Sequence, residues 1–243
     1  AGHTGDAAVP ALGMPGTFDV SGGWYDAGDY GKYVTSGGIA LWQLLHLLRL
    51  LRRIPAAGGT VPAAEVAEEC RWQLDWLLRM QVPAGRPLAG MAFHRVHGTE
   101  WSPVPGWAHR DPTERVLHRP STTATLHLAA VAAQGARLLR DDDPAYADRL
   151  LVAAQIAYRA AGEHPDLIAP DDEGRFGGGP YGDPDVADDF AWAGTALWLA
   201  TGDERYRTGP AAVDPAAFDP DGFDYDRVSG AAALDVATAG GPA

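Results

Sequence analysis

Two aspartates three positions apart, Asp26 and Asp29, are the residues of this sequence whose spacing most directly points to chemistry. Gly28 lies between them and Gly31 follows, so the backbone can adopt the angles of a tight bend. Carboxylates held close together repel each other, which raises at least one pKa unless a water or a hydrogen-bond donor intervenes. Such a pair can activate a water molecule, because one carboxylate takes its proton while the other fixes its orientation.

Two simpler roles fit the same spacing. Asp29 could cap a following helix while Asp26 closes a turn, as aspartates often do. Carboxylates on a bend also bind magnesium or calcium. The surrounding run, residues 18–34, contains side chains that a turn does not require: Trp24, Tyr25, Lys32 and Tyr33. Aromatic rings such as that of Tyr25 can stack on sugar rings, which favours a carbohydrate ligand.

Composition limits the classes of partner. The 243 residues are 46% hydrophobic and 21% charged, which is enough for one domain with a substantial core. The formal net charge of -13 argues against nucleic acid and against an anionic membrane, whereas a neutral polysaccharide needs no basic surface. The single Cys70 excludes an internal disulfide and a cysteine-based zinc cluster. We see no signal peptide and no apolar run long enough to span a bilayer, and we read the chain as a mature or excised piece.

The spacing of apolar residues predicts an all-α protein. Helices are expected over 33–51, 63–80, 121–139, 143–161 and 186–200, with a further short apolar run at 228–237. No segment shows a convincing alternation of period two. Long irregular segments at 81–120 and 163–184 separate the helices, and loops of that length in compact domains are usually functional. Antiparallel helix pairs with long loops at one end are typical of an α/α toroid, although five or six helices are too few to close one.

The run 18–34 closely resembles the N-terminal signature of glycoside hydrolase family 9, the inverting cellulases. Stretches at 80–97, 118–126 and 178–193 are similar to later segments of that family. The resemblance implies an (α/α)6 toroid, here incomplete, with residues 1–243 forming the N-terminal portion of the catalytic domain. It also implies hydrolysis of internal β-1,4-glucosidic bonds in cellulose or a related β-glucan, outside the cell and by a monomer when full length, with no cofactor required for the chemistry.

By position in that signature, Asp29 would be the general base and Asp26 would help to hold the attacking water. Inverting enzymes place the base and the acid on opposite faces of the sugar, about 6.5–9.5 Å apart. The family's general acid is a glutamate in an Asn-Glu pair, and no glutamate of this chain lies in a matching context. Without it the rate falls about 10²–10⁴-fold, so we expect the chain alone to be inactive or nearly so.

Two rival functions stay open on the sequence alone. The chain could be a catalytically inactive remnant that keeps the cleft and binds carbohydrate. It could also be another enzyme on the same toroid, such as a terpene cyclase. Open, polar loops that carry tryptophans disfavour a cyclase, because a cyclase needs a sealed apolar cavity.

Aromatic residues in the irregular segments are candidates for binding glucosyl units. Trp101 and Trp107 in the first segment and Tyr181 in the second could form stacking platforms, or alternatively could plug the ends of a barrel. The tryptophans on predicted helices are expected to be packing residues: Trp42, Trp72, Trp76, Trp192 and Trp198.

Acidic residues near the fifth predicted helix are candidates for a metal site. Asp188 and Asp189 occupy positions where related cellulases place calcium-binding acids, and Asp226 could supply a third oxygen ligand. The alternative is a helix N-terminus rich in acids, which the helix dipole favours without a metal. His94 and His97 are spaced like metal ligands, but no third ligand is evident, so we expect loop hydrogen bonds or a substrate contact.

Overall fold

The computed structural model describes residues 2–26, 29–54, 61–103, 106–169, 175–208, 219 and 222–239. Within these ranges the α-helices are α1 (Val34–Arg53), α2 (Ala63–Met80), α3 (Thr122–Leu139), α4 (Pro144–Glu163), α5 (Ala187–Thr201) and α6 (Ser229–Ala239). The predicted helices are all present, and their ends differ from the prediction by at most two residues. The all-α class is therefore confirmed.

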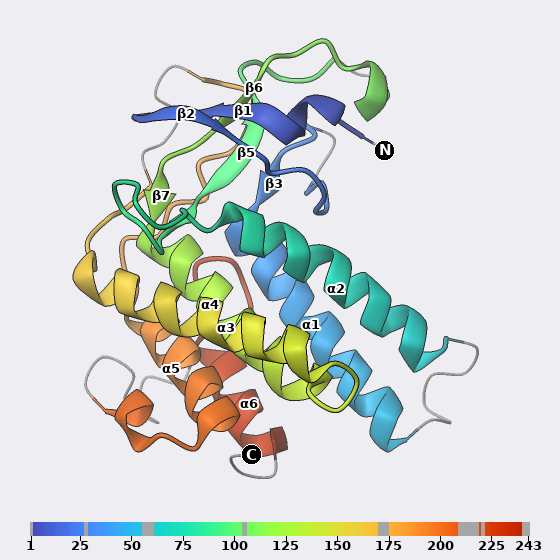
Figure 1. The fold of residues 1–243 in the computed structure, drawn as a ribbon, viewed down its shortest axis with the longest axis vertical. Coiled ribbons are helices and arrows are strands. Elements are labelled where there is room, and N and C mark those ends of the chain that lie inside the picture. The colour runs from blue at the N-terminus through green and yellow to red at the C-terminus, as the bar shows by residue number, and fades with distance from the viewer. Residues whose placement is uncertain are drawn as a thin grey trace.

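Helix α3 occupies the centre of the helical layer. It packs against α1, α2, α4 and α5, and every residue from Thr122 to Ala136 is buried. The small alanine side chains of this helix allow its neighbours to approach closely on all sides. Helices α1, α3 and α5 thus form an inner row, with α2 and α4 packed against it and α6 packed on α5 (Figure 1).

Helix ends follow the signals in the sequence. The Ser121 hydroxyl accepts a hydrogen bond from the backbone N–H of Ala124 at the start of α3. Asp143 does the same for Tyr146, and Pro144 occupies the first position of α4. Gly202, with a φ of 71°, ends α5 in the left-handed conformation that favours glycine.

The chain also forms short strands, which the spacing of apolar residues did not reveal. Strands β1 (Val9–Ala11), β2 (Met14–Phe18), β6 (Arg115–Leu117), β5 (Arg95–Gly98) and β3 (Lys32–Tyr33) form a sheet in the order β2-β1-β6-β5-β3. A second sheet pairs β4 (Ala92–Phe93) with β7 (Pro120–Ser121). Strands of two to five residues hold too few alternations to show a period of two.

The larger sheet caps one end of the helices, and the chain begins beside it (Figure 1). It joins the N-terminal segment to the segment 81–120, which the sequence predicted to be irregular. Strand β1 pairs with β2 on one side and with β6 on the other. Strand β3 lies directly after Asp29 and pairs with β5. The sheet therefore positions the two aspartates at the end of the helical layer.

The expectation that no apolar run is long enough to span a bilayer is wrong, because helix α1 could cross a membrane by length and composition. Half of its apolar window is buried inside the protein, where it contacts α2 and α3. The same composition is found in core helices of folded domains, and α1 is such a helix here.

Candidate active site

The Asp29 carboxylate has one oxygen held and one oxygen free. Its Oδ2 accepts a hydrogen bond from the Tyr33 hydroxyl at 2.7 Å. Its Oδ1 is buried and has no hydrogen-bond partner in the described part of the chain. The Ser102 hydroxyl oxygen lies 3.1 Å from the backbone carbonyl oxygen of Asp29 and 2.7 Å from Asp111 Oδ2, and its one proton serves both acceptors. The carboxylate is thus fixed in orientation while one oxygen remains able to accept a proton.

Tyr33 is the residue that orients this carboxylate. Its side chain is buried, and its hydroxyl accepts a hydrogen bond from the backbone N–H of Gly179 at 3.0 Å. The ring of Tyr181 packs edge-on against it, with 4.6 Å between centroids. Burial raises the pKa of the Tyr33 phenol, and the adjacent Asp29 charge adds to that effect. Tyr33 therefore stays neutral and donates a hydrogen bond to Asp29.

Replacing Tyr33 with phenylalanine should lower the free energy of unfolding by about 1–3 kcal/mol, because Asp29 Oδ2 and the Gly179 N–H both lose a partner. Urea denaturation of this chain measures the effect. Tyr158 is a matched control, since its ring packs on Phe190 and it makes no hydrogen bond within the described residues. Equal losses for Tyr33→Phe and Tyr158→Phe would contradict the role of the Tyr33 hydroxyl.

Asp26 lies on the same bend. Its backbone N–H donates to the carbonyl of Gly31 at 2.8 Å, which closes the bend, although Ala27 and Gly28 lie outside the described residues. Partial burial raises the pKa of the Asp26 carboxyl and the charge of Asp29 raises it further, while the hydroxyls of Tyr181 and Ser36 act in the opposite direction. The two carboxylates are therefore close enough to affect each other, as the sequence predicts.

A buried ion cluster of Asp6, Lys32 and Arg115 supports the bend at residues 22–32, called the aspartate bend below. The Asp6 carboxylate accepts hydrogen bonds from Lys32 Nζ at 2.6 Å and from Arg115 Nε at 3.0 Å. The same two cations donate to backbone carbonyls of the bend: Lys32 to Gly22 at 2.6 Å and Arg115 to Tyr30 at 2.9 Å. Asp6 thus supplies one negative charge to the two cations that fix the path of the bend.

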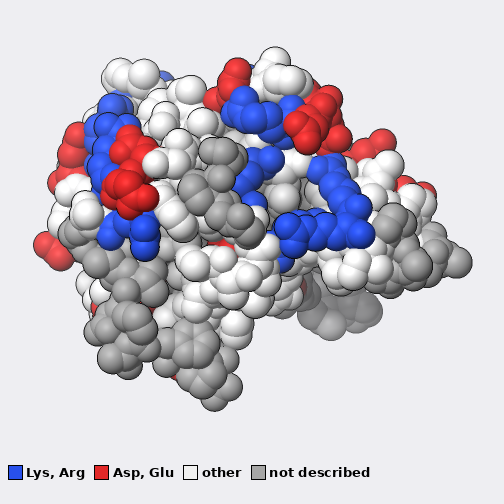
Figure 2. Space-filling model, turned by 90° about the horizontal axis from the view of Figure 1, so that it is seen from below, with Lys and Arg blue, Asp and Glu red and all other residues white. Residues whose placement is uncertain are grey.

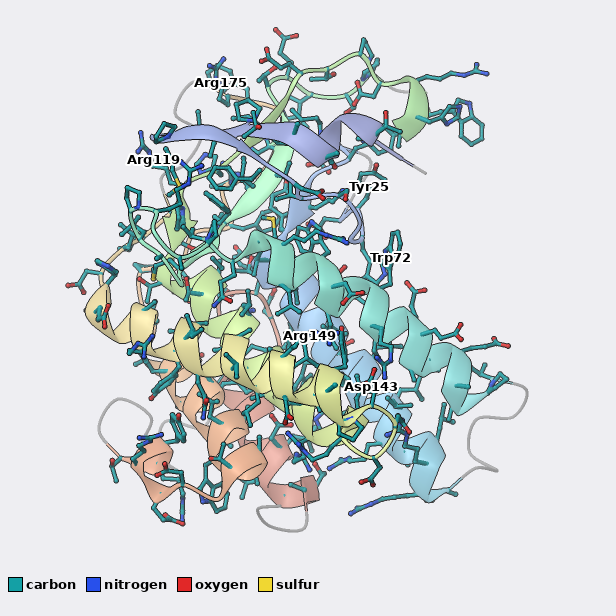
Figure 3. All side chains as sticks on the ribbon, in the orientation of Figure 1. Tyr25, Trp72, Arg119, Asp143, Arg149 and Arg175 are labelled. Atoms are coloured by element: carbon teal, nitrogen blue, oxygen red, sulfur yellow. The ribbon has the colours of Figure 1, made fainter. Side chains whose placement is uncertain are left out.

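Tyr25 belongs to the same support. Its hydroxyl accepts from the backbone N–H of His3 at 2.9 Å and lies 2.8 Å from the His3 ring nitrogen Nδ1. Its ring packs edge-on against Tyr30, and Lys32 Nζ lies over its face, 5.3 Å from the centroid. The labelled Tyr25 side chain lies between the sheet and the helices in Figure 3.

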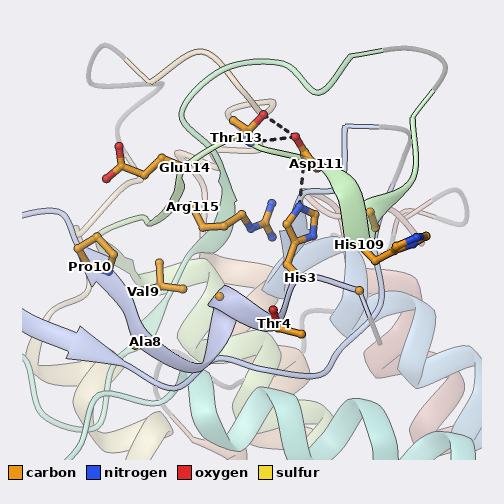
Figure 4. Close-up of a pocket in the computed structure, with 13 residues that line it drawn as sticks. His3, Thr4, Ala8, Val9, Pro10, His109, Asp111, Thr113, Glu114 and Arg115 are labelled. Atoms are coloured by element: carbon orange, nitrogen blue, oxygen red, sulfur yellow. Dashed lines mark hydrogen bonds and ion pairs between the residues drawn. The ribbon is translucent and has the colours of Figure 1, made fainter.

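A pocket of about 410 Å³ lies next to this support, between the first residues of the chain and residues 108–115. Figure 4 shows Asp111 turned toward His3 and Thr113 inside it. Burial opposes ionisation of Asp111, yet hydrogen bonds from the Thr113 and Ser102 hydroxyls lower its pKa to about 2. The described residues that line the pocket do not include Asp26 or Asp29, so the pocket is separate from the aspartate pair.

The aromatic candidates of the loop over the bend are exposed. Trp101 is 59% and Trp107 is 69% exposed, so neither plugs the end of a barrel in this structure. The loop is tied to the bend by the Ser102 bond to Asp29 and by the Tyr30 hydroxyl, which donates to Gly106 at 2.7 Å.

The outcome for the other aromatic candidates is mixed. Tyr181 lies beside Asp26, and its ring packs against that of Tyr225 with 4.9 Å between the ring centroids. The expectation that Trp72 is a packing residue is wrong, because its side chain is 53% exposed and projects from α2 (Figure 3). Trp42, Trp76 and Trp192 are buried as predicted.

Three carboxylates form a second acidic group at the start of α5. Ligand oxygens of Asp183, Asp188 and Asp189 lie within 4.8 Å of one another. Burial, together with the neighbouring carboxylates, raises the pKa of Asp183 to about 7 and that of Asp189 well above its usual value. Asp183 was not singled out from the sequence, although it precedes Asp188 by only five residues. Asp226 is not part of this group and contacts Arg227 instead, while Val228 N–H donates to Asp188 at 2.7 Å.

His127 lies beside this acidic group, next to Asp189. Its Nδ1 lies 3.1 Å from the backbone carbonyl of Thr35, so Nδ1 carries the proton and Nε2 is an acceptor. Burial lowers the pKa of His127 to about 4, which keeps the ring neutral. Nε2 lies 3.0 Å from Asp189 Oδ1, and neither atom has a hydrogen-bond partner among the described residues. Two acceptors this close require a proton or a cation between them.

Comparison with known proteins decides the family. The sequence model of Glycosyl hydrolase family 9 matches residues 1–239. The chain belongs to this family. Within glycosyl hydrolase family 9, it is 47% identical over 228 residues to Endoglucanase C of Cellulomonas fimi, covering 85% of this chain and 20% of that protein. It is 40% identical over 210 residues to a cellulose 1,4-beta-cellobiosidase of Acetivibrio thermocellus, covering 79% of this chain and 23% of that protein.

Solved family 9 structures confirm the architecture. A single mutant of a thermostable endoglucanase from Alicyclobacillus acidocaldarius superimposes with a TM-score of 0.82 at 30% identity, covering 98% of this chain and 45% of that chain. The Bacteroides ovatus family 9 structure superimposes with a TM-score of 0.79 at 28% identity, covering 96% of this chain and 46% of that chain. The helical rows described above are therefore part of an (α/α)6 toroid. The chain spans about a fifth of the length of the two relatives and under half of these structures.

Proposed function

We propose that this chain supplies the water-activating half of a site that hydrolyses internal β-1,4-glucosidic bonds of cellulose or a related β-glucan with inversion. The observation that carries the proposal is the buried, unpartnered Oδ1 of Asp29, whose other oxygen is fixed by Tyr33. A base held in this way accepts a proton without first having to reorient.

This geometry supports the following reaction. Asp29 Oδ1 takes a proton from water while the water oxygen bonds to the anomeric carbon. The glycosidic bond breaks, and the leaving oxygen takes a proton from a carboxylic acid on the opposite face of the sugar. Asp26, whose carboxylate lies on the same bend, holds the water in line. We place the acid outside this chain, because none of its glutamates matches the family's acid.

Side chains around the bend fit a polysaccharide substrate. Trp101 offers an exposed ring and precedes Ser102, which contacts Asp29, and Tyr181 borders Asp26. Tyr25 contributes by holding the bend through His3. Since cellulose is too large to enter a cell, we also propose that the full-length protein acts outside the cell, and does so as a monomer.

The stereochemistry of the product tests the proposal. A catalytic domain that contains this chain should cleave cellopentaose to give the α-anomer at the new reducing end, because a single displacement inverts the anomeric carbon. Proton NMR during the first minutes measures it. A β-anomer formed first would refute inversion. Hydrolysis by this chain alone, at a rate comparable with that of the longer protein, would refute the placement of the acid.

We further propose that Asp183, Asp188 and Asp189 bind one calcium ion with a structural role. Calcium takes hard oxygen ligands such as carboxylates. The buried oxygens of Asp189 and Asp183 Oδ2 have no hydrogen-bond partner within the described chain, which fits a cation among them. The sequence suggested Asp226 as the third oxygen ligand; the geometry supports Asp183 in its stead.

Calcium should bind more weakly as the pH falls from 7 to 5. Without the ion, the raised pKa of Asp183 stabilises the fold below its ordinary value of 3.8, and this stability is lost as the pH rises to about 7. Calcium replaces the protons, so binding must release them. A hundredfold excess over Kd should raise the free energy of unfolding by about 2.7 kcal/mol at pH 7.

Titration calorimetry at the two pH values, in two buffers of different ionisation enthalpy, measures calcium affinity and proton release together. Asp183→Asn should abolish binding, and Asp226→Asn is the matched control that should retain it. No heat of binding at millimolar calcium and pH 7 would refute the site. Loss of binding in Asp226→Asn but not in Asp183→Asn would restore the ligand set expected from the sequence.

A further inference from the structure

Three arginines gather at the end of the helices opposite to the aspartate bend. Arg49 and Arg53 lie four residues apart on α1, and therefore on one face of it, and Arg137 lies in the last turn of α3. Helix α1 begins directly after Tyr33 and has 20 residues, so this end lies about 30 Å from the bend. Figure 2, which looks onto the lower end of the helices, shows basic side chains on a protein of net charge -13.

The C-terminal carbonyls of the helices explain why some of these arginines lie here, but not all of them. C-terminal carbonyls attract cations, and Arg52 Nη1 donates to the carbonyl of Leu138 at the end of α3. Arg53 Nη1 reaches the carbonyl of Thr238 on α6 only at 3.5 Å. Arg52 also pairs with Asp142. The C-terminal turns of α1, α3 and α6 thus converge here, but their carbonyls do not account for Arg49 and Arg137.

Arg49 and Arg137 are left with unused donors. Arg49 Nη1 is buried without a hydrogen-bond partner, and its Nη2 reaches only the His46 ring. Arg137 makes no hydrogen bond or ion pair with any described residue, although it is half-buried. Burial lowers the pKa of both guanidiniums, the charge of Asp235 acts in the opposite direction, and the charge of Arg53 lowers both further. Positive charges are therefore held together here against their mutual repulsion.

The nearby Asp235 carboxylate offsets only part of this repulsion, because the pKa of Arg49 and that of Arg137 both remain lowered. Asp235 is buried, and its Oδ1 accepts from Trp42 Nε1 at 3.1 Å and lies 2.7 Å from His46 Nε2. Its Oδ2 accepts from Trp192 Nε1 at 3.2 Å. His46 Nδ1 lies 3.2 Å from Arg49 Nη2, so the ring accepts there and donates from Nε2. Asp235 is thus bonded on both oxygens and reaches Arg49 only through the imidazole.

We propose that Arg49, Arg53 and Arg137 form a binding site for one oxyanion, either a free phosphate or sulfate or a carboxylate carried by a polypeptide. Guanidinium groups present forked pairs of donors that match the oxygens of these groups. An oxyanion placed among them would take up the unused donors of Arg49 and Arg137 and supply the missing negative charge. The site is independent of the hydrolytic function, because it lies at the other end of α1.

Thermal unfolding of this chain tests the site. Inorganic phosphate at ten times its Kd should raise Tm by about 3–6 °C over sodium chloride of equal ionic strength. N-acetylglutamate serves as the probe for a polypeptide carboxylate. A response to phosphate alone assigns the site to a free inorganic anion, and a response to both probes supports the general oxyanion site. A response to N-acetylglutamate alone assigns it to a protein carboxylate.

Two variants make the result decisive. Arg137→Gln should abolish the anion response and, in chloride alone, leave the protein at least as stable, because it removes an unpaired and repelled charge. Arg159→Gln is the matched control, since Arg159 is exposed on α4 and should keep the full response. No shift with either probe, or an unchanged response in Arg137→Gln, would overturn the proposal. A loss of stability in chloride alone would show that the arginine already has a partner, and would overturn it as well.

Discussion

Replacing Asp29 with asparagine should lower kcat for β-glucan hydrolysis about 10²–10⁴-fold in a catalytic domain that contains this chain. Asparagine keeps the shape of the side chain and an oxygen that can accept from Tyr33, so the bend should remain in place. The amide cannot take a proton from water, which removes the acceptor in the step where the water attacks. Steady-state kinetics on a soluble cellooligosaccharide measures the loss, and KM should change little.

The control for this prediction is an aspartate that no contact ties to the bend. Asp148 is a suitable choice, because its side chain is 67% exposed and pairs with Arg140 at the surface of α4. Asp148→Asn should have wild-type kinetics. Asp29→Asn should still bind cellulose, as measured by a pull-down on insoluble substrate. Wild-type turnover in Asp29→Asn would refute the assignment of the base, and a parallel loss of binding would indicate that the bend had collapsed.

Replacing Asp6 with alanine should lower the free energy of unfolding by about 3–5 kcal/mol, because Lys32 and Arg115 would remain buried without their counter-charge. All three side chains are at most 5% exposed, so solvent cannot replace the lost carboxylate. Domains of this size are stable by only about 5–15 kcal/mol, so the loss is a large share of the total. Urea denaturation followed by circular dichroism measures it.

An exposed ion pair supplies the comparison. Asp148→Ala removes a carboxylate from a surface pair and should cost no more than about 1 kcal/mol. If Asp6→Ala costs as little, the ion cluster does not hold the bend. Removing a cation together with Asp6, as in Asp6→Ala with Lys32→Met, should recover part of the stability, because one uncompensated charge is gone.

The helices were predictable because each shows its apolar face over three or more turns, and several carry their own end signals. Asp143 before Pro144, and Gly202 after α5, are local features that need no knowledge of the fold. The strands were not predictable for the opposite reason. Strand β3 has two residues and exists because β5 pairs with it, although the two are more than sixty positions apart in the sequence.

The candidate site divides in the same way. Asp26 and Asp29 could be found because a dense motif surrounds them. The residues that orient them are harder to find in the sequence. Tyr33 is held by the backbone N–H of Gly179, which lies in a distant segment of the chain. In the acidic group, Asp183 and His127 become recognisable only when the fold brings them to Asp189. A list of acidic residues in the sequence cannot separate Asp183 from Asp226, because burial decides between them.

Because His3 and Asp6 reach the aspartate bend, the extreme N-terminus of this chain matters for anyone who produces the protein. Removing the first six residues would take away the His3 contact of Tyr25. It would also leave Lys32 and Arg115 buried without the Asp6 carboxylate. Such a shortened protein would still contain the whole signature motif, and yet its lack of activity would say nothing about that motif. An affinity tag cleaved close to His3 calls for the same care.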